Sequence, residues 1–384
     1  MARIPSFFCF ALLLCTCCLG QTPSGAQQVS QTGNASNSNA EKGAHAAAEA
    51  GSGGKTSEKE DVTPPAPVRL TAIESVVSKT ETAVGFGDTR CDGNGNVYLG
   101  RSGSGDSIHK INSKGELVAS FNPEANPDFE IYGVGHFYVT PDGEVYVPVG
   151  SKTSIYWRIL VYKSDGSYST NIKPDVSVPV APATLAVFPN GNVLMTGNKL
   201  DRNSKLFVIP FAGIFRPDGK LLKKITLEQE EHLPDTSAMR NLSPGQPMPV
   251  ISNRAVDWGQ TQPASDGNIY IMRWGSPAQF YAVSPGGEVV KRFSVDPGSS
   301  SFDPDRMHIS GGRIAVVFRS ASSNEIMKIV DLDGQELENY EISPSGSKAE
   351  PLGVFACYTQ SPERFTFAIT NEDLKLKLKQ VEAR

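Results

Sequence analysis

The sequence has little cysteine and little histidine, and after its first 20 residues it has no long apolar run. Four of the six cysteines lie within those 20 residues, so only Cys91 and Cys357 remain for the rest of the chain. Two cysteines exclude a disulfide-rich scaffold and a zinc site made of cysteines. Because a second apolar run is lacking, no later segment is predicted to cross a membrane.

The sequence also lacks a large excess of basic or acidic residues. The chain has 36 basic and 41 acidic residues, which gives a net charge of −5 at pH 7. A weakly acidic chain is unsuited to general binding of nucleic acid, so we expect no nucleic-acid partner. The sequence contains no Gly-x-Ser-x-Gly, His-Glu-x-x-His or phosphate-loop motif, which excludes the commonest signatures of serine hydrolases, zinc proteases and nucleotide-binding enzymes.

Residues 1–20 have the composition of an export signal peptide. Arg3 precedes an apolar run over residues 7–19, and the small residues Cys18 and Gly20 stand third and first before a cleavage point. A segment of this kind is too short to span a bilayer and is removed on export. The chain is therefore predicted to be periplasmic or extracellular.

A lipid-anchored form is the alternative, because residues 14–17 loosely resemble a lipidation motif that ends at Cys17. A threonine stands where such motifs prefer Gly or Ala, so we favour soluble export. Residues 21–65 are rich in Ser, Gly and Ala and have almost no large apolar side chain, which predicts a disordered linker. Residues 66–384 are the length of one repeat domain.

Six copies of a short phrase organise this domain, each a turn rich in Gly, Asn and Asp that runs into a small apolar strand. The copies are DGNGNVYLG, TPDGEVYVPVG, FPNGNVLMTG, SDGNIYIMRWG, SGGRIAVVF and a degenerate SPERFTFAI. Their central apolar positions are Val97, Val145, Val193, Ile269, Ile314 and Phe365. Apart from one interval of 76 residues, these positions recur every 45 to 51 residues, which is the length of a four-stranded propeller blade.

An alternating strand and a tight turn follow the phrase in five copies. The predicted turns are Lys114-Gly115, Asp165-Gly166, Asp218-Gly219, Gly286-Gly287 and Asp333-Gly334. Glycine there supplies the positive φ angles that tight hairpin turns need. Each repeat therefore predicts two hairpins, made of strands a, b, c and d. Since no 3.6-residue period appears, the predicted fold is all-β, a six-bladed β-propeller with four-stranded blades.

The sixth copy lacks a d strand, because the chain ends after one further alternating segment, LKLKLKQV. An unpaired strand edge would remain there. The segment PVRLTAIESV, which starts at Pro67, looks like the missing d strand. We predict that it closes the ring by pairing with the C-terminal strand; the alternative is an open or five-bladed arrangement.

The phrase D-G-N-I/V-Y-V followed by I-x-x-I/F-x-x-x-G resembles the NHL-repeat and related six-bladed propellers, over nearly all of the chain after the linker. The resemblance implies the architecture. It does not imply one activity, because that superfamily includes protein-binding modules, lactonases such as gluconolactonase, strictosidine-synthase-like enzymes and amidating lyases.

The two faces of the predicted ring differ in their connections. The a–b and c–d turns are tight and share one face, the turn face, whereas the b–c and d–a connections are long and varied and share the other, the long-loop face. Binding groups usually lie on long loops of a rigid scaffold, so the long-loop face is the candidate functional face. It carries the one large insertion, residues 228–257, which either covers the channel mouth or is a solvated surface loop.

Polar residues recur where strand a of each blade is predicted to begin, near the axis. Alignment to the repeat places Asp88, His136, Thr184, Gln260 and Arg306 at this position. Convergent polar groups at a concave mouth are the usual form of a ligand site. The alternative is that strand starts are polar only because they contact water.

Arginines recur a few residues after the central apolar positions. Arg101 and Arg273 fall in blades one and four, which face each other across a six-fold ring, and Arg319 falls in blade five. Guanidinium groups bind carboxylates and sulfates through paired hydrogen bonds, and the neighbouring Trp274 suits stacking on a sugar ring. These residues predict an anionic or carbohydrate ligand. In the alternative, the arginines cover apolar surface and the tryptophan packs in the core.

We expect a binding module without a resident cofactor. Resemblance to the lactonases implies a divalent cation held by a cage of carboxylate and amide oxygens, but the aligned ring offers one carboxylate, Asp88. The alternative is a metal-dependent hydrolase or lyase that uses the central channel. It would hold a cation such as calcium on Asp88, Asp257 and Asp305, with His136 as the base.

The remaining cysteines fall on strand a of blades one and six, which are neighbours in a closed ring. A disulfide needs Cα atoms within about 7 Å, and inner strands of adjacent blades often lie further apart, so we predict that Cys91 and Cys357 are buried free thiols. His109 and His308 are predicted to be packing or surface residues. The whole chain is thus predicted to be an exported, monomeric propeller that binds a partner protein or a small polar or anionic ligand through its long-loop face.

Overall fold

The structure is a computed structural model, and it describes residues 68–70, 74–77, 88–100, 107–126, 130–202, 207–227, 258–343, 352–370 and 376–382. All of these residues belong to one compact unit, Pro65–Arg384. The predicted export signal (residues 1–20), linker (residues 21–65) and insertion (residues 228–257) lie outside the described residues.

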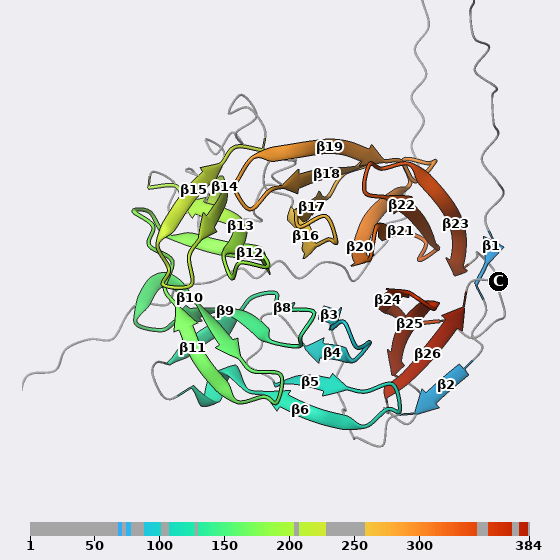
Figure 1. The fold of residues 1–384 in the computed structure, drawn as a ribbon, viewed down its shortest axis with the longest axis horizontal. Coiled ribbons are helices and arrows are strands. Elements are labelled where there is room, and N and C mark those ends of the chain that lie inside the picture. Colours follow the sequence, from blue (N-terminus) through green and yellow to red (C-terminus); the bar gives the residue numbers. More distant parts are fainter. Residues whose placement is uncertain are drawn as a thin grey trace, which may run out of the picture. The chain divides into compact units, whose positions relative to one another are not determined.

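The described strands form six small sheets, arranged around a common centre as a six-bladed β-propeller (Figure 1). Strands within each blade pair antiparallel, and strand a lies innermost. In the described ranges the only helix is a three-residue 3-10 helix, η1 (Pro123–Ala125). The predicted fold class is confirmed.

The first three blades follow one another along the chain, and strand a of blade two is split in two. Blade one consists of β3 (Asp88–Cys91), β4 (Val97–Gly100), β5 (Ile108–Ile111) and β6 (Leu117–Phe121). Blade two consists of β7 (Ile131–Val134), β8 (Tyr138–Val139), β9 (Val145–Ser151), β10 (Ser154–Tyr162) and β11 (Tyr168–Ile172). Blade three consists of β12 (Val180–Val187), β13 (Val193–Leu200), β14 (Phe207–Phe215) and β15 (Leu221–Ile225).

The last three blades complete the ring, and the sixth takes its outer strand from the N-terminal side of the unit. Blade four consists of β16 (Trp258–Pro263), β17 (Ile269–Arg273), β18 (Ala278–Val283) and β19 (Val289–Val295). Blade five consists of β20 (Phe302–Ser310), β21 (Arg313–Ser320), β22 (Glu325–Asp331) and β23 (Glu336–Ser343). Blade six consists of β24 (Val354–Gln360), β25 (Glu363–Thr370), β26 (Leu376–Glu382) and β2 (Glu74–Val77).

The ring closes as predicted, because β2 pairs antiparallel with the C-terminal strand β26, with Val76 opposite Leu378. The segment that was predicted to form one d strand forms two short strands instead. β1 (Val68–Arg69) first adds a fifth, parallel strand to β23 of blade five, and only β2 reaches blade six. The N-terminal segment therefore pairs with two adjacent blades.

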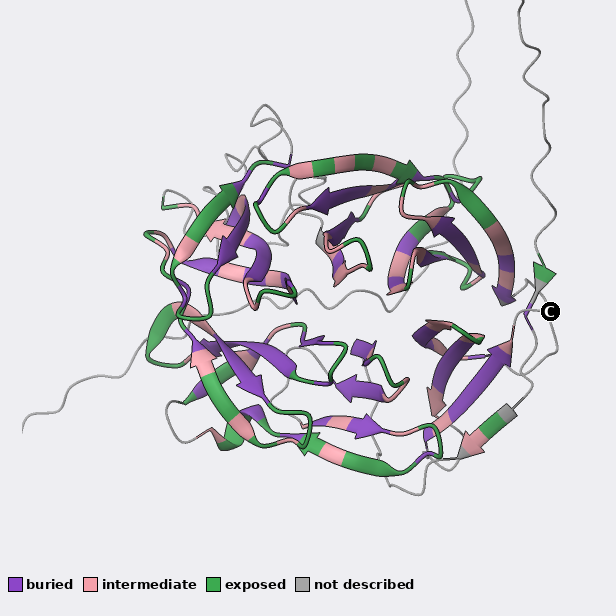
Figure 2. Cartoon of the chain, viewed as in Figure 1, coloured by how far each residue is buried: buried purple, intermediate pink, exposed green. Residues whose placement is uncertain are grey.

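The repeated phrase becomes strand b, and its central apolar side chain lies in the core of every blade. All six of these side chains are at most 1% exposed: Val97, Val145, Val193, Ile269, Ile314 and Phe365. Outer strands instead alternate between partly buried and exposed residues, as β19 does, because only one of their faces packs against the rest of the propeller. Figure 2 shows the result, with buried residues on the inner strands and exposed residues on the outer ones. The glycines of all five predicted c–d turns have positive φ.

The prediction of free thiols is wrong. Cys91 at the end of β3 and Cys357 on β24 form a disulfide, with their Cα atoms 5.4 Å apart. The inner strands of blades one and six converge toward the axis, so these positions come within the reach of a disulfide. The bond joins the first complete blade to the last.

Candidate functional site

Asp88 lies at the centre of a buried polar network at the long-loop end of the channel. It is 2% exposed and begins β3. Arg90 Nη1 donates to its Oδ1 over 2.6 Å, and His136 Nδ1 lies 3.1 Å from its Oδ2. Burial alone would raise the pKa of Asp88, but the charges of Arg90, His136 and Arg306 outweigh it and lower the pKa to about 2. Asp88 is therefore an anion that orients its neighbours.

His136 is the accessible member of this network. Strand a of blade two breaks between β7 and β8, where the backbone N–H of Gly135 donates to the carbonyl of Pro148. The break places His136 outside the ladder, and 49% of its side chain is exposed while its ring contacts Asp88. A ligand at this end of the channel would meet an imidazole that is already oriented.

Two further arginines lie nearby, and both have carboxylate partners. Arg306 Nε donates to Asp305 over 3.0 Å, and its Nη1 donates to the hydroxyl of Thr89 over 3.0 Å. Arg319 Nε donates to Glu325 over 2.7 Å, and its Nη2 lies 3.8 Å from Asp305. Burial raises the pKa of Glu325, against the opposing charge of Arg319. The arginines of this cluster are thus matched by acidic groups.

The other predicted site residues have different surroundings. Thr184 is buried on β12 and shares a 2.7 Å hydrogen bond with Thr196 on β13. Gln260 on β16 accepts a hydrogen bond from the backbone N–H of Met307 in the next blade. Both side chains connect strands. The structure therefore joins Asp88, His136 and Arg306 of the predicted ring into one network. Thr184 and Gln260 instead hydrogen-bond to adjacent strands and stabilise the fold.

The structure describes only some of the arginine and tryptophan residues that were predicted to bind an anionic or carbohydrate ligand. Arg273 ends β17 and is 3% exposed, whereas Trp274 follows it with 43% of its surface exposed. Arg101 lies outside the described residues, as does Asp257 of the metal alternative. Among the described residues, no three His, Cys, Asp or Glu side chains gather as a metal site would require.

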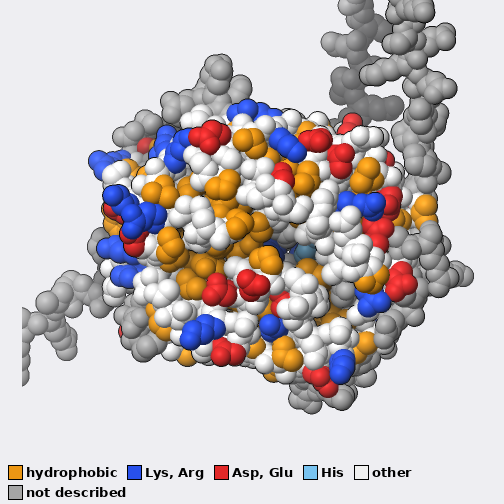
Figure 3. Space-filling model, in the orientation of Figure 1, with side chains coloured by type: hydrophobic (Ala, Val, Ile, Leu, Met, Phe, Trp, Pro, Cys, Tyr) orange, Lys and Arg blue, Asp and Glu red, His pale blue; other side chains and the backbone are white. Residues whose placement is uncertain are grey.

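The described part of the channel also contains a cavity of about 650 Å³ at its opposite end. Its rim is built from a–b turns, including Gly93, Pro141, Gly191 and Ser265, so it opens on the turn face. We call it the turn-face cavity. Figure 3 shows this face, with a central hollow in which basic and histidine side chains are visible and beside which acidic side chains lie.

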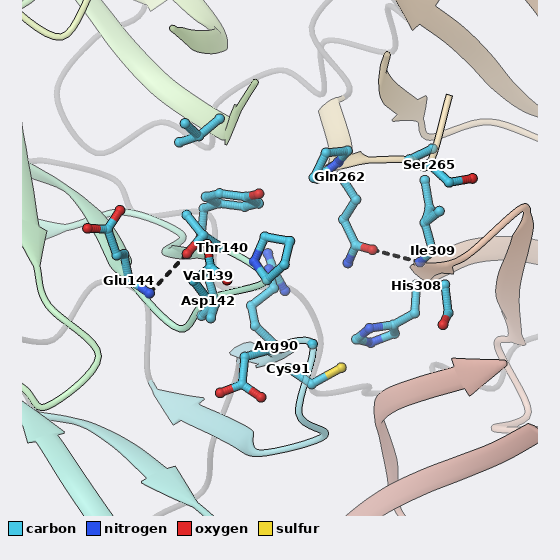
Figure 4. Close-up of a pocket in the computed structure, with 18 of the residues that line it drawn as sticks. Arg90, Cys91, Val139, Thr140, Asp142, Glu144, Gln262, Ser265, His308 and Ile309 are labelled. Atoms are coloured by element: carbon cyan, nitrogen blue, oxygen red, sulfur yellow. Dashed lines mark hydrogen bonds between the residues drawn. The ribbon is translucent and has the colours of Figure 1, made fainter. Parts of the chain in front are cut away.

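Two buried side chains that the repeat alignment did not select form the polar floor of this cavity. Arg90 and His308 line it together with Gln262, and Figure 4 shows Arg90 and His308 directed toward its centre. His308 is 2% exposed, and burial, followed by the charges of Arg90 and Arg306, lowers its pKa to about 3. His308 is therefore neutral at physiological pH. As predicted it is a packing residue, with its ring against Phe355, and it also lines the cavity.

A simple signal in the sequence points to these residues. Arg90, Gln262 and His308 each stand two positions after a residue of the predicted polar ring. Side chains two apart on a strand face the same way, so a second axial ring follows from the first. His109, by contrast, lies on β5 with its ring 3.1 Å from the Ser120 hydroxyl.

No protein-family model matches the sequence, and no curated protein matches it. Among solved structures it is similar to a PQQ-bound aldose sugar dehydrogenase from Streptomyces coelicolor, with 12% identity, a TM-score of 0.45, and coverage of 83% of this chain and 99% of that one. It is also similar to a putative gluconolactonase, with 13% identity, a TM-score of 0.41, and coverage of 82% and 95%. A protein of unknown function from Bacteroides caccae matches with 11% identity, a TM-score of 0.42, and coverage of 67% and 81%. Similarities this low add nothing to the choice of function.

Across the described ranges, the structure contains no helix of the length and apolarity that a membrane span requires.

Proposed function

We propose that this chain is an exported, NHL-like propeller that binds a small polar ligand at the long-loop end of its central channel, without catalysis of its own. The observation that carries the proposal is the network around Asp88, in which a buried carboxylate orients Arg90 and the half-exposed His136. Groups fixed in this way lose little conformational freedom when a ligand binds.

The charges of this end favour an uncharged polar ligand, with carbohydrate as the class that fits best. Arg90 is paired with Asp88, and Arg306 and Arg319 are paired with Asp305 and Glu325. An anion would have to compete with carboxylates that are already in contact. Hydroxyl groups both donate and accept, so they can join such a network without displacing a partner. Trp274 offers an exposed aromatic face beside strand β17.

The disulfide supports export. Cysteine pairs of this kind persist in the periplasm or outside the cell and are rare in reducing compartments. The bond between Cys91 and Cys357 therefore agrees with the composition of residues 1–20. Mass spectrometry of protein purified from the producing cell tests this point, because export predicts a mature chain that begins near Gln21 and carries the intact disulfide.

A glycan array with the purified, processed protein tests the ligand class. We expect neutral oligosaccharides to bind, and Trp274→Ala to weaken binding about tenfold through loss of its aromatic face. Val290→Ala, on the exposed side of outer strand β19, is the control and should bind normally. Binding of sulfated or carboxylated glycans alone would favour the anionic ligand instead. A stoichiometric divalent cation that is lost in Asp88→Asn would favour the metal-dependent hydrolase or lyase.

A further inference from the structure

The turn-face cavity has the physical properties of a small-molecule site, and it opens on the face opposite the long-loop end, with Arg90 between the two. Its volume of about 650 Å³ lies in the range of ligand pockets, about 300–1,000 Å³. Its walls are mixed: Val139, Phe188 and Ile309 give apolar surface, whereas Asp142 and Glu144 bring carboxylates to the rim. Apolar surface beside a group of convergent polar side chains is typical of sites for small organic ligands.

His308 supplies the strongest evidence that something binds there. Its Nε2 atom is buried and has no hydrogen-bond partner among the residues that the structure describes. The backbone of Phe355 raises the pKa of the same ring, as an acceptor for its Nδ1 proton does, and with this tautomer Nε2 is an acceptor. A buried acceptor without a partner is costly, so a donor that reaches Nε2, from a ligand or from water, is stabilised there.

Arg90 offers the complementary group. Its hydrogen bonds to Asp88 and to the carbonyl of Thr89 both use Nη1. A guanidinium has five N–H donors, so others remain for the cavity that Arg90 lines. The floor therefore presents N–H donors from Arg90 and an acceptor from His308. A carboxylate suits Arg90 but not Nε2, because it has no proton to donate.

We infer that the turn-face cavity binds a small uncharged amide, a carboxamide or lactam on an apolar or aromatic body, whose carbonyl accepts from Arg90 and whose N–H donates to His308. The apolar part of the walls contacts the body of the ligand, and a neutral amide suits both a rim that carries carboxylates and a floor on which Arg90 is already paired with Asp88. The benzamide test is read out at this face alone, although Arg90 also contacts Asp88 of the long-loop network.

Titration of the intact protein with benzamide and with benzoate, followed by ligand-observed NMR, tests the inference. The two probes share an aromatic body and differ in charge and in the N–H donor. We expect saturable benzamide binding and weaker benzoate binding. His308→Phe keeps a ring against Phe355 but removes the acceptor, and it should weaken benzamide binding about tenfold, because the amide N–H would then be buried without a partner.

A second variant keeps the test decisive if His308→Phe folds poorly. Val187 lies in the wall of the cavity and is only partly buried, so Val187→Trp should fill the mouth and reduce benzamide binding at least as much. His109→Phe repeats the histidine substitution on β5, away from the cavity, and should bind benzamide normally. No saturable benzamide binding, benzoate binding as tight as benzamide, or unchanged affinity in both cavity variants would each overturn the inference.

Discussion

Arg90 is charged and nearly fully buried, and Asp88 is the anion that balances it. Their atoms lie 2.6 Å apart, with side chains 8% and 3% exposed. Asp88→Asn keeps the shape but leaves the Arg90 charge without its partner. We expect a loss of about 3–5 kcal/mol in the free energy of unfolding, measured in urea at pH 7.

The pair between Arg216 and Asp218 provides the matched control for this substitution. It has the same 2.6 Å separation, but its side chains are 50% and 52% exposed. Asp218→Asn should therefore cost less than about 1 kcal/mol. Equal losses of unfolding free energy in the two variants would mean that Asp88 does not stabilise the buried charge of Arg90.

The pKa of Asp88 also predicts a response to acid. Because the folded pKa of about 2 lies below the value of 3.8 for an unperturbed Asp, the ionised carboxylate stabilises the fold fully above pH 3.8. Its contribution, about 2 kcal/mol, is lost as the pH falls from 3.8 toward 2. Unfolding below pH 4 should thus be less steep in Asp88→Asn than in the wild type.

His308 gives a response at higher pH. Its folded pKa of about 3 lies below the ordinary value of 6.5, because the ring is buried and faces Arg90 and Arg306, with Asp88 opposing them. The unfolded chain takes up this proton first, so the fold loses stability as the pH falls below 6.5, by about 2–3 kcal/mol at pH 4.5. Urea unfolding of His308→Phe should lack this part of the slope, whereas His109→Phe should retain it. Parallel slopes in wild type and His308→Phe would refute a buried neutral His308.

At the scale of single residues, the repeat alignment predicts one ring of axial residues but does not predict the second ring, which includes Arg90 and His308. Alignment to the repeat selects Asp88, His136 and Arg306 because they occupy equivalent positions. Arg90 and His308 follow from the two-residue period of a strand, but their burial and the cavity beside them depend on how six blades meet. The residue pattern along the chain does not show how the six blades pack together.

At the scale of single elements, some glycine turns contact the neighbouring blade and others do not. Gly219 in the turn between β14 and β15 has φ +87°, and a Cβ there would lie 2.0 Å from the carbonyl oxygen of Lys173. Gly267 in the turn between β16 and β17 has φ +81°, with nothing within 4 Å of a Cβ. The two positions share a backbone conformation and differ in their surroundings.

Substitution by alanine separates these two effects. Gly267→Ala should cost about 1–2 kcal/mol, the penalty of a left-handed conformation. Gly219→Ala adds a clash with backbone, so we expect it to cost at least about 2 kcal/mol more, as measured by urea unfolding. Similar costs in both variants would show that the Lys173 backbone moves away freely.

Sequence patterns predict the strands and hairpin turns better than they predict where a strand is interrupted. Each Asp-Gly or Gly-Gly pair marks a hairpin, because the turn itself requires positive φ. The break at His136 has no such local cause, since it depends on Gly135 bonding to Pro148 on another strand. The splitting of the N-terminal segment into β1 and β2 likewise depends on the position of the edge of blade five.

At the scale of the whole molecule, two devices hold the ring closed: the disulfide and β2. The missing d strand of the sixth repeat predicts the pairing of β2 with β26, since a sheet edge needs a partner. The disulfide was not predicted, because the 5.4 Å between its Cα atoms arises from convergence of two inner strands that are 266 residues apart in sequence.

Removal of the disulfide tests the first device. Replacing Cys91 and Cys357 by alanine should lower the free energy of unfolding by about 2–5 kcal/mol, because the bond restricts a long loop in the unfolded chain. A reducing agent should bring the wild type to the stability of the double variant and leave that variant unchanged. A wild type that is indifferent to reduction would show that β2 alone determines closure.

Truncation tests the second device. A chain that begins at residue 79 lacks β1 and β2, so the edge of β26 is unpaired and the buried Leu378 and Gln380 lose the strand beside them. Four residue pairs join β2 to β26, and at about 1 kcal/mol for each pair the loss is on the order of 4 kcal/mol. Exposed edges also recruit other strands, so this chain should self-associate in sedimentation, whereas a chain that begins at residue 66 should stay monomeric and keep its stability. If the shorter chain is equally stable and monomeric, the N-terminal strand does not close the propeller.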